Sequence, residues 1–463
     1  MREEYLRIES FEEFHVTDCK GKQEVNEHMR YRFQGIIPIG KMKEYAAKGA
    51  GDCRVHVYAM GEHGREDWLC GVVEEIQLDV AGQACMMQMT LVSGTVLMDM
   101  QKHTRTFQSG TWMYHQLLDT CNSAYEQPVK IMTVGNGRQI GQMVVQYQET
   151  DWEFVKRLAS QNQTVVMADA ETWGTKYYFG LPKRDSTIAG DMQEYRIQYD
   201  MKSYWEKKNQ GLAVTKSDFV YYIWESREIY QLGDRGLIGD KPFLVWKIET
   251  SMRGNNLYHT YYMKPESAFR TTVRENPQIV GASLFGAVID VKDEQVKVAV
   301  QNDENAENTG NRWFPYATMY SSSDGSGWYC MPEIGDSVRL YFPTSNEAEA
   351  YAASAYHEVG SSRRKDPSCK FWRNKQGKEI RLAKDRILMT NNNGTYMELS
   401  DDDGIEIRSS GTIRIQAGAV MEISSNHSQI ELNARTKVSL RQGSTEMRID
   451  KSGFDVKGSR VKL

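Results

Sequence analysis

The sequence lacks any apolar segment that could enter or cross a membrane. Its N-terminal residues, MREEYLRIESFEEFHV, are charged where a secretory signal would need an apolar stretch. No apolar run approaches the roughly 20 residues that a membrane-spanning helix requires. We therefore expect a chain that is made in the cytoplasm without a cleaved signal peptide.

The cysteines show no pairing pattern. There are seven of them, and no two form a CxxC pair. An odd, dispersed set argues against a disulfide framework and against a zinc site, so reduced and mostly buried thiols are expected. We predict no metal and no cofactor from these positions: Cys19, Cys53, Cys70, Cys85, Cys121, Cys330 and Cys369.

The chain also lacks basic runs. Its net charge is −5, which gives no reason to expect nucleic acid as a partner. At 463 residues it is too long for one compact core, and two to four domains are expected. The 10 tryptophans and 25 tyrosines are ample for well-packed globular parts.

No proline occurs after Pro367. From Gly377 onward, short apolar–polar–apolar units recur along the sequence. Period-two alternation predicts strands with one buried and one wet face. Glycine, asparagine and aspartate separate the units. The paired apolar positions are Ile380/Leu382, Ile387/Met389, Met397/Leu399, Ile405/Ile407, Ile413/Ile415, Met421/Ile423, Ile430/Leu432, Val438/Leu440, Met447/Ile449, Phe454/Val456 and Val461/Leu463.

One copy of this repeat cannot close a core, because two apolar residues in each unit are too few. Three intertwined copies would bury the pairs and would pair every strand edge, so residues 379–463 are predicted to form an intertwined trimeric β-helix spike. A single-chain β-solenoid or ordinary hairpins are the alternatives. Val461 and Leu463 are predicted to end the spike as an apolar platform. The predicted core is Ile405, Ile407, Ile413, Ile415, Ile423, Ile430, Leu432, Val438 and Leu440.

Residues 279–358 alternate in several short segments separated by glycine-rich turns, which predicts a small five-stranded OB-type barrel. Such barrels bind nucleic acid or sugar in some proteins. That role needs exposed aromatic side chains interleaved with Lys and Arg, and this segment is poor in both basic residues. A structural collar is therefore favoured. Residues 359–378, rich in Ser, Arg and Lys, are interpreted as a linker.

Particular motifs resemble one family. "VKVAVQND…WFPYAT…GSGWYCMPEIGDSVRLYF" is similar to the OB module of VgrG and of phage baseplate spike proteins. "LMDMQKHTRTFQSGTWMYHQLLDTC" and "QYQETDWEFVKRLA" resemble the hub of VgrG and of the phage tail protein D family. Thr150 or Asp151 can cap a helix in the second hub motif. The hub-motif residues are Tyr147, Glu149, Asp151, Trp152, Phe154 and Arg157.

The resemblance covers essentially the whole chain and implies a mainly β, multidomain protein. Residues 1–275 would form a hub of two β-barrel-like subdomains with a helical insert around 111–160, followed by the OB collar and the spike. The family implies a homotrimer that seats on the first ring of a tail tube among baseplate proteins. A PAAR-like tip protein and transient contact with a target membrane are implied as well. Effector cargo and the type of machine (phage tail, bacteriocin, extracellular injection particle or type VI-like) stay open.

No catalytic residue is predicted. Glu149 and Asp151 have the chemistry of an acid/base pair, but they lie in a structural motif. Asp401–Asp403 are interpreted as a turn, and His427 as a solvent-facing residue, with a three-histidine ion site on the spike axis as the alternative. The expected role is the non-enzymatic central spike and hub of a contractile injection machine, a particle component made in the bacterial cytoplasm. A cell-wall or polysaccharide hydrolase on a trimeric β-helix, or a receptor-binding fibre, is the alternative.

Overall fold

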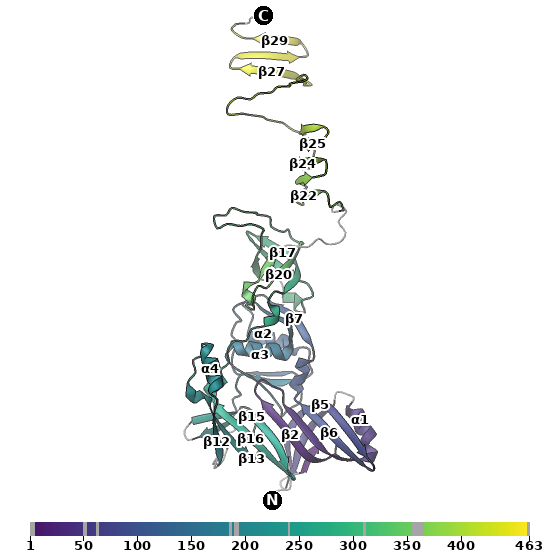
Figure 1. The fold of residues 1–463 in the computed structure, drawn as a ribbon, viewed down its shortest axis with the longest axis vertical. Helices are drawn as coiled ribbons and strands as arrows, with labels where there is room; N and C mark the ends of the chain where they lie inside the picture. The colour runs from purple at the N-terminus through teal and green to yellow at the C-terminus, as the bar shows by residue number, and fades with distance from the viewer. Residues whose placement is uncertain are drawn as a thin grey trace. The chain divides into compact units, whose positions relative to one another are not determined.

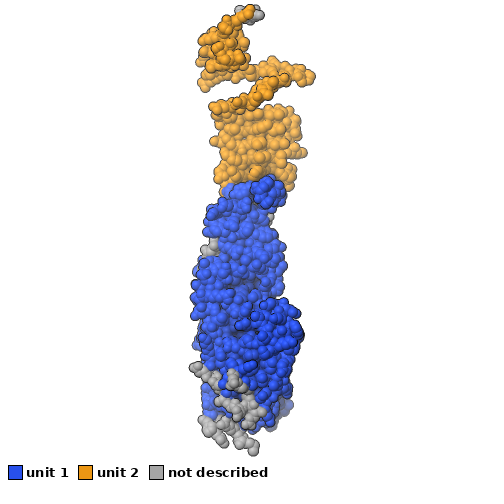
Figure 2. All heavy atoms as spheres, turned by 90° about the vertical axis from the view of Figure 1, so that its left-hand side faces the viewer, with its two compact units in different colours: residues 1–357 blue, residues 358–463 orange. Residues whose placement is uncertain are grey.

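The computed structural model describes residues 5–49, 53–61, 64–184, 188, 194–238, 241–308, 312–353 and 365–460. The chain divides into two compact units, residues 1–357 and residues 358–463 (Figure 2). None of the described helices is long and apolar enough to cross a membrane.

The first unit is built on one 11-stranded sheet. Its strands alternate between buried and exposed side chains, as Tyr31, Phe33 and Ile37 of β3 show on the buried side. In spatial order the strands are β1 (Tyr5–Ile8), β4 (Arg54–Gly61), β5 (Gly64–Ala81), β6 (Ala84–Val92), β3 (Arg30–Pro38), β2 (His15–Glu24), β15 (Lys241–Arg253), β16 (Asn256–Pro265), β13 (Val220–Ser226) and β12 (Tyr195–Tyr199), with β14 (Arg235–Ile238) paired to β15. Helix α1 (Met42–Gly49) packs near β5, and α4 (Met201–Asn209) follows β12.

The pairing of β2 with β15 joins the two halves of this sheet. A buried polar chain lies at the junction, where the Tyr31 and Thr250 hydroxyls are 3.1 Å apart. The Thr250 hydroxyl is in turn 2.8 Å from His259 Nδ1. Gly21 allows this approach, because a Cβ there would lie 2.0 Å from the Tyr31 ring. The hub therefore has one continuous sheet with a separate hydrophobic core on each half, and the two barrel-like subdomains expected from the sequence stay a prediction.

A second layer carries two further helices of the first unit. Strands β7 (Lys102–Phe107) and β9 (Val144–Thr150) pair, and α2 (Tyr114–Asn122) and α3 (Asp151–Gln161) pack beside them (Figure 1). A small sheet of β10 (Val166–Ala168), β11 (Lys176–Phe179) and β8 (Val129–Met132) completes the layer. Thr150 is the N-cap of α3: its hydroxyl accepts from the Glu153 N–H, and the Glu153 carboxylate accepts from the Thr150 N–H.

Residues 283–353 form a five-stranded sheet in the order β19-β18-β17-β20-β21. A parallel bridge between Tyr316 and Ala352 links its two ends, as expected for a small barrel. Its core is formed mainly by valine, leucine and phenylalanine. The strands are β17 (Ser283–Lys292), β18 (Gln295–Val300), β19 (Trp313–Pro315), β20 (Ser337–Tyr341) and β21 (Tyr351–Ala353).

The second unit holds two antiparallel meanders joined by an extended stretch (Figure 1). The first consists of β22 (Lys370–Arg373), β23 (Glu379–Leu382), β24 (Arg386–Thr390), β25 (Tyr396–Ser400) and β26 (Gly404–Arg408). The second consists of β27 (Lys437–Gln442), β28 (Thr445–Asp450) and β29 (Gly453–Lys457). Asp401–Asp403 form the turn between β25 and β26.

Two expectations for the second unit need correction, and one stays a prediction. Consecutive units of the meanders pair within one chain, and the intertwined trimeric β-helix stays a prediction. Residues 409–436 form no strand within this chain, because the stretch lies alongside no ladder partner. Strand β22 also lies inside the range interpreted as a linker. The predicted core residues that lie outside strands are Ile413, Ile415, Ile423, Ile430 and Leu432.

His259 at the sheet junction predicts an acid-sensitive contribution to stability. Burial lowers the pKa of His259 from 6.5 to about 4. The unfolded chain therefore binds a proton at His259 more tightly than the folded chain does. The contribution of the neutral, buried His259 to the free energy of unfolding is complete above pH 6.5 and is lost as the pH falls toward 4. We expect His259→Gln to reduce the pH-dependent loss of unfolding free energy between pH 7 and 4 by on the order of 2–3 kcal/mol in urea titrations.

His15 provides the control for this measurement, because its side chain is exposed on β2 of the same sheet. His15→Gln should leave the pH dependence of the unfolding free energy as it is in the wild type. Equal pH dependence in wild type and His259→Gln would contradict the assignment of the effect to the buried imidazole.

Candidate functional site

The apolar residues of both meanders share one face of each sheet. In the first meander, the strand registers align Ile380 with Met389, Met389 with Met397, and Met397 with Ile407. A parallel row aligns Leu382, Ile387, Leu399 and Ile405. The second meander aligns Val438 with Ile449 and Leu440 with Met447. We call these two surfaces, on residues 380–407 and 438–456, the apolar faces.

Neither apolar face is covered within one chain. Ile405 and Ile407 are 67% and 56% exposed, and Leu440 is 60% exposed. The residues between the meanders are just as open, with Ile415 at 74%. Val461 and Leu463, the predicted platform, lie outside the described residues. The predicted core positions therefore line a surface that a single chain leaves in water.

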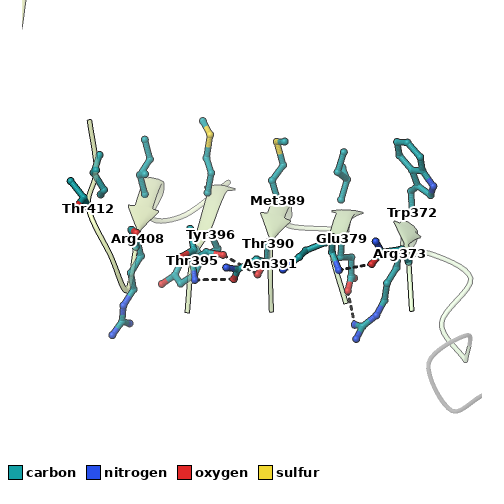
Figure 3. A pocket seen from close by; sticks show the side chains of 17 residues that line it. Trp372, Arg373, Glu379, Met389, Thr390, Asn391, Thr395, Tyr396, Arg408 and Thr412 are labelled. Carbon is teal, nitrogen blue, oxygen red and sulfur yellow. Dashed lines mark hydrogen bonds and ion pairs between the residues drawn. The ribbon is translucent and has the colours of Figure 1, made fainter. Parts of the chain in front are cut away.

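A pocket on the apolar face of the first meander is lined by the kind of side chains that form a protein core. Figure 3 shows Trp372 and Met389 standing on the same side of the strands, with polar side chains on the other side. The apolar lining consists of Trp372, Ile380, Met389, Met397, Ile407 and Ile413. Small-molecule sites usually place a few convergent polar groups among their apolar walls. This lining resembles half of a protein interior.

The opposite face of the first meander is polar and is stabilised by ion pairs. Arg386 lies 3.2 Å from Glu398 on the neighbouring strand, and Arg373 and Arg381 both bond Glu379. Partial burial alone would raise the pKa of Glu379, but the hydrogen bonds from the two arginines hold it below its usual value. Each meander is thus two-sided, with a solvated face behind an apolar one.

The hub-motif residues come together in the first unit. Trp152 and Phe154 are fully buried in the core around α2 and α3, where the Phe154 ring stacks on Phe107 at 5.9 Å. Tyr147 packs instead against the OB barrel. Asp151, which was a candidate for the helix cap, is buried; its carboxylate accepts from Arg105 at 2.5 Å and from the Tyr125 hydroxyl at 2.6 Å.

Arg157 connects helix α3 to the OB barrel. Its guanidinium donates to Glu149 at 2.8–3.1 Å and to Glu347 at 2.9 Å, and all three side chains are buried. Glu347 lies on the short helix Glu347–Glu349 between β20 and β21. Burial raises the pKa of Glu149, although Arg157 opposes the shift. Because Glu149 pairs with Arg157 in this joint, its position supports a structural role.

A loop of the OB barrel completes the joint. Glu304 accepts from the Thr104 N–H at 3.1 Å and lies 2.6 Å from His103 Nδ1. Asp303 accepts from the Thr106 N–H at 3.0 Å. Burial raises the pKa of Asp303, and the hydrogen bonds from Thr106 oppose the shift. The loop is therefore held along strand β7 by backbone and side-chain contacts.

Strand β9 is buried on both sides of this joint. Val144 belongs to the core of the helical layer, whereas Val145 belongs to the core of the OB barrel. Met143, just before the strand, also packs in the barrel core. A strand shared by two cores allows little independent movement of either part.

Sequence reasoning did not identify Glu347, Glu304 or Asp303. All three lie in segments that appear polar and solvent-exposed in the sequence, and their partners lie about 190 to 200 residues away. Among the described residues, no group of three or more His, Cys, Asp or Glu side chains could hold a metal. His427 lies exposed in the extended stretch.

Removing Arg157 should cost more stability than removing Glu347. Arg157→Met leaves two buried carboxylates without a counter-charge, and we expect a loss of about 3–5 kcal/mol in unfolding free energy. Glu347→Gln leaves Arg157 paired with Glu149 and should cost about 1–3 kcal/mol. Urea unfolding of the full chain measures both losses.

The control for this comparison is an exposed ion pair. Glu126, 3.1 Å from Arg54, has a side chain that is 80% exposed. Glu126→Gln should cost less than about 1 kcal/mol. Equal losses for Arg157→Met and Glu126→Gln would show that the buried joint contributes no more than a surface pair.

Comparisons with known proteins place this geometry in context. Residues 49–178 match the model of the phage tail baseplate hub (GPD) family, and residues 284–357 match the type VI secretion system/phage-baseplate injector OB domain. Neither matched model describes an enzyme. No curated protein sequence matches the chain.

Solved structures share the fold at low identity. The Escherichia coli c3393 protein, a type VI secretion component described as similar to the T4 tail proteins gp27 and gp5, has a TM-score of 0.55 at 13% identity, covering 75% of this chain and 98% of that one. The lidded Francisella PdpA–VgrG complex has a TM-score of 0.57 at 7% identity, with coverages of 88% and 80%.

The two matched domains follow one another in the predicted order, and the expected OB fold is confirmed. The sequence motifs predicted the hub helix and the OB barrel. Arg157 and strand β9 join these two parts. By these two matched domains and its fold, the chain is similar to VgrG-like baseplate hub–spike proteins of the phage or type VI kind.

Proposed function

We propose that three copies of this chain pack their apolar faces together and form the spike of a contractile injection machine. The observation that carries the proposal is the uncovered apolar face of each meander, repeated strand after strand. Burying one large aliphatic side chain stabilises a protein by about 1.5–3 kcal/mol. Leaving a whole row of them in water would favour aggregation, so a specific self-association is required.

Three copies suit the geometry of the faces. Each strand contributes two apolar side chains, and three faces turned toward a common axis would bring six to each layer. Within the meanders the backbone ladders are already formed, so partner copies are needed there for side-chain packing. Residues 409–436 lie alongside no ladder partner in their own chain, and partner copies can supply both packing and backbone hydrogen bonds.

The order of the domains supports a division of labour. Residues 1–275 would seat on the first ring of the tail tube, residues 279–358 would form a collar, and residues 379–463 would form the puncturing spike. Contraction of a sheath would supply the energy. A PAAR-like protein would cover the platform at Val461 and Leu463, residues beyond the described part of the chain.

This role is non-enzymatic, and two assays separate it from its rivals. A cell-wall hydrolase would release soluble fragments when the purified protein is incubated with peptidoglycan. A receptor-binding fibre would adsorb to intact target cells by itself. We expect neither activity, because the joint explains the buried carboxylates at Glu149 and Asp151 by structural pairing.

The trimer predicts a sharp effect of charge on the apolar face. Met397 and Leu399 lie on that face, and Thr390 and Ser400 lie on the other side of the same meander. Native mass measurement of the full chain should give three copies for the wild type. Met397→Asp with Leu399→Asp should give mainly one copy, because buried unpaired carboxylates are costly.

Thr390→Asp with Ser400→Asp is the matched control, since it adds the same charge to the solvated face. This variant should remain a trimer. A wild-type monomer with the meanders folded would contradict the proposed function.

The same pair of variants tests puncturing in assembled particles. Particles made with the Met397→Asp, Leu399→Asp protein should deliver at least tenfold less cargo, or kill at least tenfold fewer sensitive cells, than particles with the Thr390→Asp, Ser400→Asp protein. Survival counts of target cells measure the difference. Undiminished delivery by the first variant would separate the apolar face from the puncturing role.

A further inference from the structure

A cleft in the first unit is lined by residues of both the helical layer and the large sheet. Its volume is about 500 Å³, which falls within the roughly 300–1,000 Å³ of small-molecule sites. Part of the lining comes from the loops that follow β8 and α3, at Thr133 and Gln163. Another part comes from the start of β14 and from the short helix Glu266–Phe269. The cleft is therefore large enough for a compact ligand and is formed within one chain.

Three cationic side chains and one carboxylate line this cleft. Lys183 follows β11, Arg235 begins β14, and Arg270 follows the short helix. Glu266 supplies the carboxylate, which lies 3.6 Å from Arg235. Three positive charges and one negative charge give the lining a net charge of +2. A concave surface with one sign of charge attracts a ligand of the opposite sign, so this lining favours an anion.

Two of the cations are available to a ligand. Among the described residues, Lys183 and Arg270 form no ion pair within 4.0 Å, and both side chains are exposed. Asp218 feels the charge of Arg270, but its carboxylate already accepts hydrogen bonds from the Ser267 hydroxyl and the Thr215 N–H. A bound anion would give both cations a direct partner.

A buried lysine beside the cleft adds to its positive potential. Lys264 is 8% exposed, and its Nζ lies 4.3 Å from the centroid of the Phe269 ring, which lines the cleft. The Trp246 ring lies 4.9 Å from the same Nζ. Burial and the nearby charge of Lys207 lower the pKa of Lys264 to about 7. A buried ammonium group is costly without a counter-charge, and an anion in the cleft would supply one across the Phe269 side chain.

A phosphate group fits this lining better than a carboxylate does. At neutral pH a phosphate monoester carries about −1.5 to −2 charges and three strong acceptor oxygens, whereas a carboxylate carries a single charge. Arginine can donate two parallel N–H bonds to phosphate, and lysine binds it as a point charge. Gln163 adds amide donors, because its side chain has no hydrogen-bond partner in the described part of the chain. The charge of one phosphate would therefore balance the +2 of the lining.

We propose that this cleft binds a small molecule through a phosphate group held by Lys183, Arg235 and Arg270. The rest of the ligand would lie against Val134 and Leu181, the apolar residues that line the cleft beside Phe269. Because the lining comes from both layers, the bound ligand would tie the helical layer to the large sheet. The cleft is formed within one chain, so the inference does not depend on the proposed trimer.

Calorimetric titration of the full chain with inorganic pyrophosphate tests the site. At constant pH and ionic strength, the wild type should show saturable binding of one pyrophosphate to each chain. Lys183→Gln with Arg270→Gln should weaken the binding by at least about tenfold, because it removes two charge-assisted contacts. Both residues are exposed, so the double variant should keep the fold of the wild type.

Two further double variants are the controls. Arg32→Gln with Lys43→Gln removes the same charge from exposed positions of β3 and α1 and should bind pyrophosphate as the wild type does. Lys183→Arg with Arg270→Lys keeps both charges in the cleft and should bind more tightly than Lys183→Gln with Arg270→Gln.

The outcomes separate this inference from the proposed function. Absence of saturable binding by the wild type would overturn the phosphate site, and so would equal binding by the wild type and the Lys183→Gln, Arg270→Gln variant. Equal weakening in the Arg32→Gln, Lys43→Gln variant would also overturn it, because net charge alone would then attract the anion. A wild-type monomer that binds pyrophosphate through Lys183 and Arg270 would support the site while contradicting the proposed trimer.

Discussion

The structure depends on a constraint at its C-terminal part: a strand with two apolar residues on one face cannot bury them with its own chain. In the meanders of residues 370–408 and 437–457, consecutive strands form hydrogen-bond ladders, and the apolar faces remain open. Between the meanders, residues 409–436 leave backbone and side chains open together. The proposed association would cover these surfaces, and the polar faces can stay solvated because the apolar residues are confined to one side.

In the first unit, buried contacts join the helical layer to the OB barrel. Strand β9 contributes Val144 to one core and Val145 to the other, and Arg157 ties both to the barrel through Glu347. A buried ion pair contributes little net stability compared with apolar packing, but breaking it is costly. Such a joint favours a fixed geometry between the large sheet, the helical layer and the OB barrel.

Much of this could be predicted from residue patterns. The spacing of Met397, Leu399, Ile405 and Ile407 predicted strands with a shared apolar face, and these residues lie in aligned rows. The capped helix after Thr150 was predicted by the residue types at its start, although the choice between Thr150 and Asp151 needed the structure. The pairing of consecutive strands within one chain was not predicted, because alternation specifies which face is apolar and says nothing about which strand lies beside it.

The sequence by itself determined the local alternation, the order of the two matched domains and the resemblance to one family, since these depend on residue spacing and on short motifs. Tertiary structure alone decided the partners: Glu347 for Arg157, and Glu304 for His103. The physical reason is that a buried charge or a strand edge is defined by what lies next to it in space. Those neighbours come from positions that are often hundreds of residues away along the chain.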